Sequence, residues 1–187
     1  MRGQWCSLRP LVDSDAQLTF NWRHLERAAL LSAPPIDLED QRAWIRSRPS
    51  SEENYVICLS DGLPVGTIAI TEINPYHQSA QTSRFLIGEE DAVTGRPIAI
   101  EAMTLCYEKI FEDWGYRKVW GYVTASNTRM IRWQESLGMS REGLQQQQLL
   151  IGGRVEDAVL LGMTRDRYFS FAKPRMMRLL HLMGKNG

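Results

Sequence analysis

The chain of 187 residues, 43% of them apolar, suits one domain with a sizeable core and excludes a disordered chain. Its 22 lysine and arginine residues balance 22 aspartate and glutamate residues. Nucleic-acid binders usually carry a basic excess, so we expect no nucleic-acid partner. No targeting leader is visible, and no apolar run approaches the roughly 20 residues of a spanning helix, which predicts a cytoplasmic protein without an integral membrane segment.

The three cysteines, Cys6, Cys58 and Cys106, are odd in number and far apart in the sequence. This spacing argues against a disulfide framework and against a zinc site. Each cysteine has apolar neighbours, so we expect buried free thiols and no bound metal.

The first half of the chain is predicted to form one strand, two helices and three strands. Pro34-Pro35 must break the helical stretch, and Asp61-Gly62 is a hairpin signal between two of the strands. The predicted elements are a strand at 5–11, helices at 13–25 and 38–47, and strands at 54–60, 64–73 and 82–88.

The second half begins with apolar residues at helical spacing, which predict a helix from about residue 96 to just before Gly115. The elements predicted after it are a strand at 118–124, a helix at 127–137, strands at 141–151 and 154–163, and a basic tail with helix on either side of Pro174. This order predicts an α/β fold, with a mixed, mostly antiparallel twisted sheet flanked by helices in a single domain.

A glycine-containing turn, Thr94-Gly95-Arg96-Pro97, follows an acidic loop and opens the long helix. Free backbone N–H groups and the positive end of the helix dipole make such a turn an anion site. Coenzyme A carries a pyrophosphate that needs a site of this kind. The turn alone does not separate this role from an ordinary helix start.

A second motif follows, in which Asn127 begins a helix that ends at Leu137-Gly138-Met139, before Glu142-Gly143. With the turn at 94–99, this succession resembles the GNAT acetyltransferase superfamily from about residue 8 to residue 163. The resemblance implies a GNAT domain over residues 1–164 and a basic helical tail over residues 165–187. It also implies an enzyme that moves acetyl from acetyl-CoA to a primary amine of a small molecule.

The resemblance further implies a coenzyme A site. The backbone of Leu86, Ile87 and Gly88 would hydrogen-bond the pantetheine arm, and one N–H would polarise the thioester carbonyl. Asn127 would contact the pantetheine or a water, or would only cap its helix. The other residues implied for the coenzyme are Thr94, Gly95, Arg96, Pro97, Ile98, Ala99, Arg129 and Arg132.

Two residues depart from the family pattern. Pro97 stands where the turn usually has a glycine, and it removes one N–H donor, although proline is well tolerated in a first helical turn. The resemblance also places Trp133 where many members have a tyrosine that protonates the leaving thiolate. Tryptophan cannot do this, so another group or water protonates the sulfur, or the protein has lost catalysis.

Attack on the thioester needs a neutral amine, so a general base must take a proton, directly or through water. Glu72 and His77 are the candidates, because both lie near the end of the strand expected beside residues 85–88. Either side chain could instead be an ordinary solvated surface group.

The early helix carries Phe20-Asn21-Trp22-Arg23-His24, which resembles the acceptor side of the GNAT branch that acetylates nucleotide-linked amino sugars. Trp22 could stack on a base or sugar, and Arg23 could meet a phosphate. The alternatives are a Trp22 packed in the core and an Arg23 held in a salt bridge.

The tail combines a cationic side with an apolar side. Docking on a membrane surface or a partner and packing on its own domain or homodimer both stay open. Its cations are Arg165, Arg167, Lys173, Arg175, Arg178 and Lys185.

Three functions stay open at this stage. The first is acetylation of a small amine, with a nucleotide-linked amino sugar favoured. The second is acetylation of a protein N-terminus or an antibiotic amine. The third is a non-catalytic acyl-CoA-binding regulatory module, for which Trp133 is the supporting feature.

Overall fold

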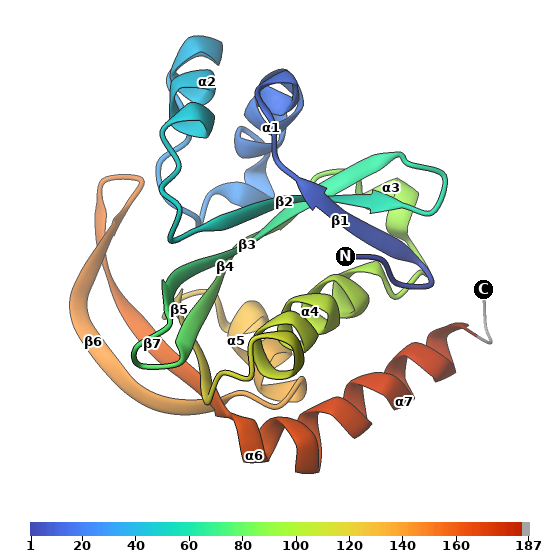
Figure 1. Ribbon diagram of the computed structural model, residues 1–187. Coiled ribbons are helices and arrows are strands. Elements are labelled where there is room, and N and C mark those ends of the chain that lie inside the picture. The colour runs from blue at the N-terminus through green and yellow to red at the C-terminus, as the bar shows by residue number, and fades with distance from the viewer. Residues whose placement is uncertain (185–187) are drawn as a thin grey trace.

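A computed structural model describes residues 1–184, which form a seven-stranded sheet with helices on both faces (Figure 1). The strand order is β1-β2-β3-β4-β5-β7-β6. Every neighbouring pair is antiparallel except β4 and β5, which run parallel. The strands are β1 (Cys6–Pro10), β2 (Glu53–Leu59), β3 (Pro64–Asn74), β4 (Ser79–Ile87), β5 (Lys118–Thr124), β6 (Ser140–Ile151) and β7 (Arg154–Thr164).

Helices α1 and α2 lie on one side of the sheet, and α4, α5 and α7 lie on the other (Figure 1). The α-helices are α1 (Ala16–Arg23), α2 (Leu38–Arg46), α3 (Glu90–Val93), α4 (Ile98–Glu108), α5 (Thr128–Ser136), α6 (Arg165–Arg167) and α7 (Lys173–Gly184). Single turns of other helix types are η1 (Asp13–Asp15), η2 (Glu26–Ala28), η3 (Lys109–Asp113) and η4 (Tyr168–Ala172). The predicted α/β class and the order of the long elements are confirmed.

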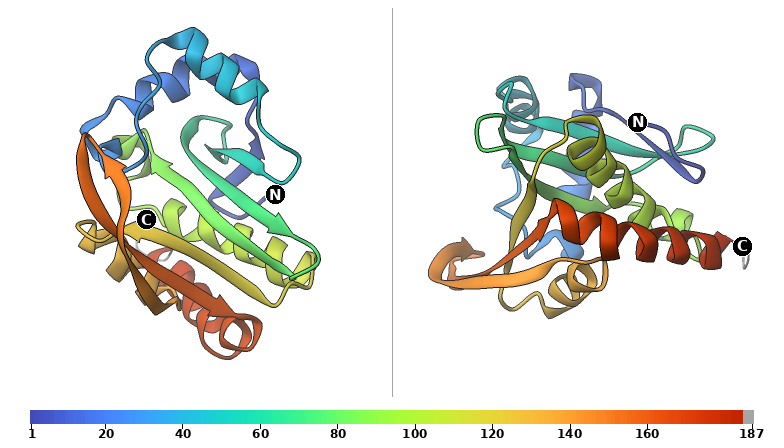
Figure 2. Two further views of the ribbon diagram at one scale, coloured as in Figure 1. Left: turned by 90° about the vertical axis from the view of Figure 1, so that its left-hand side faces the viewer. Right: turned by 60° about the horizontal axis from the view of Figure 1, so that its bottom comes forward.

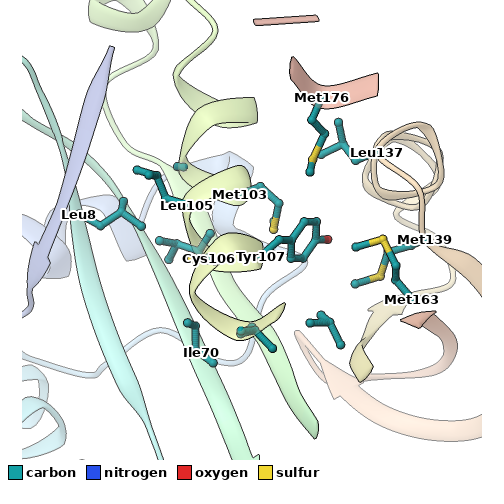
Figure 3. Close-up of a cluster of buried hydrophobic side chains, with 14 of the residues drawn as sticks. Leu8, Ile70, Met103, Leu105, Cys106, Tyr107, Leu137, Met139, Met163 and Met176 are labelled. Carbon is teal, nitrogen blue, oxygen red and sulfur yellow. The ribbon is translucent and has the colours of Figure 1, made fainter. Parts of the chain in front are cut away.

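Helix α4 is the central element of the core. Its residues Ile98, Ala102, Cys106 and Tyr107 are fully buried, because the sheet covers one side of the helix and α7 packs on another (Figure 3). The buried carboxylate of Glu101 accepts the backbone N–H groups of Gln4, Trp5 and Cys6 at 2.6–2.8 Å. The cysteines are buried and free, as predicted. These contacts fix α4 firmly against the first strand.

The C-terminal helices pack on this core through Tyr168, Ala172 and Met176, all fully buried. Three tail arginines donate to backbone carbonyls near the C-terminal ends of α4 and α5: Arg165 to Phe111, Arg167 to Gly138 (2.6 Å) and Arg175 to Ser136. Cations are favourable at these ends because the helix dipole is negative there. The described part of the tail therefore packs on its own domain, while Lys185 lies outside the described residues.

Strands β4 and β5 pair over a short stretch, from Ser79 opposite Lys118 to Gln81 opposite Trp120. Beyond this point the two strands part. On its other edge β5 pairs with β7 along its whole length, and β6 and β7 continue past the end of β5 as a long hairpin (Figure 2). The sheet is therefore continuous on both sides of β4–β5 and open between them.

Two boundaries differ from the prediction. Strand β4 begins at Ser79 rather than residue 82, because Ser79, Ala80 and Gln81 gain a partner in β5 that local preference does not reveal. The predicted acidic loop contains one helical turn, Glu90–Val93. Among residues 1–184, no helix is long and apolar enough to cross a membrane.

Candidate active site

A cavity of about 680 Å³ passes through the opening between β4 and β5. Helices α1 and α2, their connecting loop and the β6–β7 hairpin enclose it on one side of the sheet. From the other side it is reached by residues of α4 and α5. The residues at the opening are Thr82, Ser83, Arg84, Phe85 and Leu86 of β4, Tyr122, Val123 and Thr124 of β5, Met103 of α4, and Met130 and Gln134 of α5.

A β-bulge in β4 lies beside this opening. Ser83 pairs with Ala69 and Leu86 with Thr67, so Arg84 and Phe85 stand opposite a single residue, and Arg84 takes the left-handed conformation (φ 53°). The guanidinium of Arg84 is anchored by Glu52 (2.7 and 3.0 Å) and by Asn54 (2.7 Å). The bulge turns the β4 backbone at the point where the neighbouring strand has left.

The Arg84 guanidinium also sets the charge of Glu52. Its hydrogen bonds hold the pKa of the Glu52 carboxyl below its usual range, against a desolvation effect that would raise it. The Glu52 carboxylate is therefore ionised at neutral pH and already hydrogen-bonded to Arg84. It acts as a counterion in the cavity wall and not as a free base.

The end of β4 leads into the start of α4. Leu86 and Ile87 pair with β3 on one edge only, so the backbone edge facing β5 is left without a strand partner. The N–H of Gly88 donates to Val65 O (2.8 Å), and Arg27 donates to Ile87 O (3.3 Å). The pantetheine contacts expected for Leu86 and Ile87 thus fall on a strand whose outer edge faces the opening, whereas Gly88 follows the strand and directs its N–H to β3.

The turn before α4 is exposed at Thr94, Gly95 and Arg96, while Pro97 is buried. The Arg96 N–H donates to Val93 O (3.0 Å), so this amide is not one of the free donors that the sequence suggested. Pro97 is the N-cap and has no N–H. The orphan amides of the helix start are therefore those of residues 98–100, including Ile98 and Ala99.

Helix α5 presents Asn127, Met130 and Gln134 to the cavity. The Asn127 side chain accepts the N–H of Met130 (3.1 Å), so it caps the helix and also borders the opening. Arg129 and Arg132 are exposed, and within residues 1–184 neither forms an ion pair with a carboxylate. They remain available for phosphate groups of a ligand.

Trp133 does not line the cavity. Its ring stacks on Phe85 with centroids 5.1 Å apart and an interplanar angle of 16°. Gln134, the next residue, faces the cavity instead. The tryptophan thus packs between α5 and β4, and it supplies no proton donor to the cavity.

On the opposite side of the sheet, Trp22 is only 3% exposed, and its indole N–H donates to Glu89 (2.7 Å). Arg23 donates to the carbonyl oxygens of Ser32 and Ala33, and burial lowers its pKa. No carboxylate of the described chain pairs with Arg23. Both residues line the cavity, Trp22 as a packed core residue and Arg23 as a cation bound to backbone oxygens.

The two candidate bases are placed differently. Glu72 lies at a second irregularity, in β3, with a left-handed backbone (φ 49°), and its exposed side chain borders the cavity. His77 is exposed in the β3–β4 turn, where its carbonyl accepts a hydrogen bond from Arg117 (3.3 Å), and it does not line the cavity. The geometry therefore favours Glu72 and offers no support for His77 as base.

Comparison with protein families decides the class. Residues 6–140 match the family model of the acetyltransferase (GNAT) domain, which is more than half of the chain. The chain belongs to the GNAT acetyltransferase family. It is an acetyl-CoA-dependent N-acetyltransferase, as the sequence motifs predicted.

Solved structures share this fold. A GCN5-related N-acetyltransferase from Brucella melitensis has 20% identity and a TM-score of 0.80, over 94% of this chain and 83% of its own. A probable GNAT acetyltransferase from Chromobacterium violaceum has 20% identity and a TM-score of 0.80, over 90% and 87%. Spermidine N-acetyltransferase from Vibrio cholerae, in complex with CoA and spermine, has 19% identity and a TM-score of 0.78, over 90% and 100%. Among curated proteins, no sequence matches the chain significantly.

Three residues that line this GNAT cavity were not predicted from the sequence: Thr82, Arg84 and Gln134. Gln134 carried a usable signal, because Asn127, Met130 and Gln134 are spaced i, i+3, i+7 and so share a helix face that excludes Trp133. The sequence gives no signal for Thr82 or Arg84, because the bulge and the separation of β4 from β5 depend on how the strands pair in the folded sheet. Within residues 1–184, no cluster of three or more metal-ligating side chains occurs.

Proposed function

We propose that this enzyme binds acetyl-CoA through the opening between β4 and β5 and transfers acetyl directly to a small primary amine held in the cavity. The observation that carries this proposal is the cavity itself, which runs through the parted strands and connects the two sides of the sheet. A thioester entering from the α4–α5 side would meet an acceptor on the α1–α2 side.

The pyrophosphate would bind at the start of α4, where orphan amides and the helix dipole favour anions. Arg96 lies on the exposed turn there, and Arg129 and Arg132 are exposed on α5. Pantetheine would pass Gly88 and follow the free edge of Leu86 and Ile87 back toward the bulge. The residues that we assign to this path are Leu86, Ile87, Gly88, Thr94, Gly95, Arg96, Ile98, Ala99, Asn127, Arg129 and Arg132.

The bulge would place a β4 backbone N–H at the thioester carbonyl, where it stabilises the negative charge that develops on oxygen. The neutral amine attacks the carbonyl carbon, the C–N bond forms, and the C–S bond breaks with its electron pair on sulfur. The nitrogen loses one proton and the sulfur gains one. Glu72, at the edge of the cavity, would accept the proton from nitrogen directly or through water.

The acceptor that we favour is a nucleotide-linked amino sugar. The cavity volume of about 680 Å³ suits a ligand larger than a simple amine. Arg23 offers a cation to which no described carboxylate is paired, and Trp44 of α2 offers a half-buried aromatic ring in the cavity wall. A cation and a ring are the groups that a phosphate and a base or sugar require.

A polyamine is the second candidate. The carboxylates of Glu72 and Asp40 both border the cavity, and within residues 1–184 neither is ion-paired. Free carboxylates suit a ligand with several ammonium groups. The Vibrio cholerae neighbour that was solved with spermine shares this fold at 19% identity.

The test is release of coenzyme A thiol from acetyl-CoA in the presence of single amines. The panel contains UDP-linked amino sugars, spermidine and spermine, peptides with free N-termini, and aminoglycosides. We expect the highest kcat/KM with a sugar nucleotide. A preference for polyamines would establish the second candidate, and release with peptides or aminoglycosides alone would remove both.

A further inference from the structure

Buried polar atoms without a partner gather where β4 and β5 part. Within residues 1–184, four buried side-chain atoms have no hydrogen-bond partner: Thr82 Oγ1, Tyr107 OH, Gln134 Oε1 and Arg42 Nε. Thr82 and Gln134 line the cavity at the opening. Tyr107, on α4, does not line it, and its hydroxyl acts on the cavity only through Thr82, whose hydroxyl influences the pKa of the Tyr107 phenol. Folded proteins pair nearly all such atoms, so the unpaired Thr82 and Gln134 atoms in the cavity wall are groups that a bound ligand would satisfy.

Thr82 is the first β4 residue beyond the last pair with β5, Gln81 with Trp120. It is 6% exposed and lies two residues before the bulge at Arg84. At Gly121 of β5 an added Cβ would lie 3.3 Å from the carbonyl oxygen of Thr82, so the strands are still close at this point. The Thr82 hydroxyl therefore sits at the narrow end of the opening.

Tyr107 supports this hydroxyl from α4. Its ring lies beside Met103 and points toward Met139 and Met163, so methionine side chains surround it and offer no strong acceptor (Figure 3). Burial raises the pKa of the Tyr107 phenol, and the adjacent Thr82 hydroxyl offsets part of that rise. Within residues 1–184 neither hydroxyl has a hydrogen-bond partner, and Thr82 is the hydroxyl to which Tyr107 can donate.

If acetyl-CoA binds as set out above, its pantetheine runs along β4 from Gly88 toward Arg84, and its sulfur reaches the narrow end of the opening. We propose that the Thr82 hydroxyl donates a hydrogen bond to the sulfur as the C–S bond breaks, and that Tyr107 donates to the Thr82 oxygen behind it. This pair of hydroxyl groups would stabilise the leaving thiolate, which in the family pattern is protonated by a tyrosine on α5. Gln134 faces the same point from α5.

The step needs no net proton from either hydroxyl. The C–S electron pair moves to sulfur, the Thr82 hydrogen bond stabilises the negative charge, and Thr82 stays neutral. The proton that finally neutralises the thiolate is the one that the attacking nitrogen loses, carried by Glu72 and water. Removing the Thr82 hydroxyl therefore raises the energy of the thiolate without altering any charged group.

Other charges in the cavity also act on a bound thiol, and the variants must leave them in place. Serine or valine at position 82 changes none of them. The charged side chains that line the cavity are Arg23, Asp40, Glu52, Glu72 and Arg84, of which Glu52 and Arg84 pair with each other.

The test measures the thiol pKa of bound coenzyme A from the ultraviolet absorbance of the thiolate across pH. It compares the unaltered enzyme with Thr82→Ser, Thr82→Val and Tyr107→Phe. We expect the pKa to rise by about one pH unit in Thr82→Val, by less in Tyr107→Phe, and to stay near that of the unaltered enzyme in Thr82→Ser. The kcat with the best amine should fall in the same order, with KM for acetyl-CoA little changed.

Binding of desulfo-CoA, which lacks the thiol, is the control for folding and should be equal in all four proteins. Loss of desulfo-CoA binding in Thr82→Val would leave the decision to Tyr107→Phe and Thr82→Ser. An unchanged thiol pKa in the folded variants would overturn the role of Thr82 while leaving the proposed function intact. Failure of the unaltered enzyme to bind coenzyme A would overturn both.

Discussion

The two edges of β5 behave differently. Along one edge, β5 pairs with β7 through all seven of its residues, Lys118–Thr124. Along the other, it pairs with β4 only at Lys118–Trp120. The first edge completes the sheet, whereas the second leaves backbone donors and acceptors of β4 without a strand partner.

This difference explains where a ligand can bind. Backbone N–H and C=O groups need partners, and a ladder that stops halfway offers them to a bound molecule. We propose that coenzyme A takes the place of the missing strand pairs beside Leu86 and Ile87. On the closed edge the same groups are already paired, so the β5–β7 pair can serve only as scaffold.

The largest effect is expected from removing the base on the open side. Glu72→Gln should lower the rate of acetyl transfer at neutral pH by about 10²-fold or more, because a general base contributes that much, and should leave coenzyme A affinity unchanged. Steady-state kinetics across pH is the measurement. His77→Gln, in the turn outside the cavity, is the control and should keep full activity. A larger loss in His77→Gln than in Glu72→Gln would reverse the assignment.

The bulge beside the open edge can be destabilised by removing the ion pair between Arg84 and Glu52. The Arg84–Glu52 pair stabilises the fold above the unfolded-state pKa of glutamate, and this contribution is lost as pH falls through the lower folded-state pKa of Glu52. Arg84→Met should therefore lower the free energy of unfolding by about 1–2 kcal/mol at pH 7. The difference from the unaltered enzyme should shrink below about pH 4.

Urea denaturation at several pH values measures this effect. Arg141→Met, which removes the more exposed Arg141–Glu135 pair, is the matched control and should cost less than about 0.5 kcal/mol. An Arg84→Met loss of the same size at pH 3 and pH 7 would show that the bulge does not depend on this ion pair.

The phosphate end of the open edge is tested by charge reversal. Arg96→Glu should weaken coenzyme A binding about tenfold at low salt, because a carboxylate would then oppose the pyrophosphate at the start of α4. Arg154→Glu makes the same change at the exposed first residue of β7, away from the start of α4, and should bind coenzyme A normally. Titration calorimetry distinguishes them, and equal affinities would remove Arg96 from the site.

The smallest effect is expected from adding one hydrogen-bond donor at the start of α4. Pro97→Ala restores the N–H that proline lacks at the start of α4, so we expect coenzyme A to bind about threefold more tightly. Calorimetry on this variant measures the gain. Weaker binding would mean that the backbone conformation fixed by proline, and not the missing N–H, determines the affinity for coenzyme A at this turn.

The fold could be predicted from sequence because strands and helices bury their apolar residues with different periods. Residues such as Ile98, Ala102 and Tyr107 place α4 in the core whatever the details of its neighbours. For the site, the sequence yields predictions only where a motif occurs, as at the turn before α4, and these stay predictions. The Arg84 bulge depends on the pairing of β4 with β3, and the position of Thr82 depends on the pairing of β4 with β5, which lies 39 residues further along the chain at Gln81 and Trp120. A local sequence pattern contains no information on either pairing.

The most direct test of coenzyme A binding at the open edge compares hydrogen exchange of the backbone amides with and without coenzyme A. We predict slower exchange in β4 from Phe85 to Ile87 and at the start of α4 from Ile98 to Ile100, with β7 unchanged. Protection confined to β6 and β7, or coenzyme A binding without protection of β4, would contradict the claim that the ligand occupies the open edge between β4 and β5.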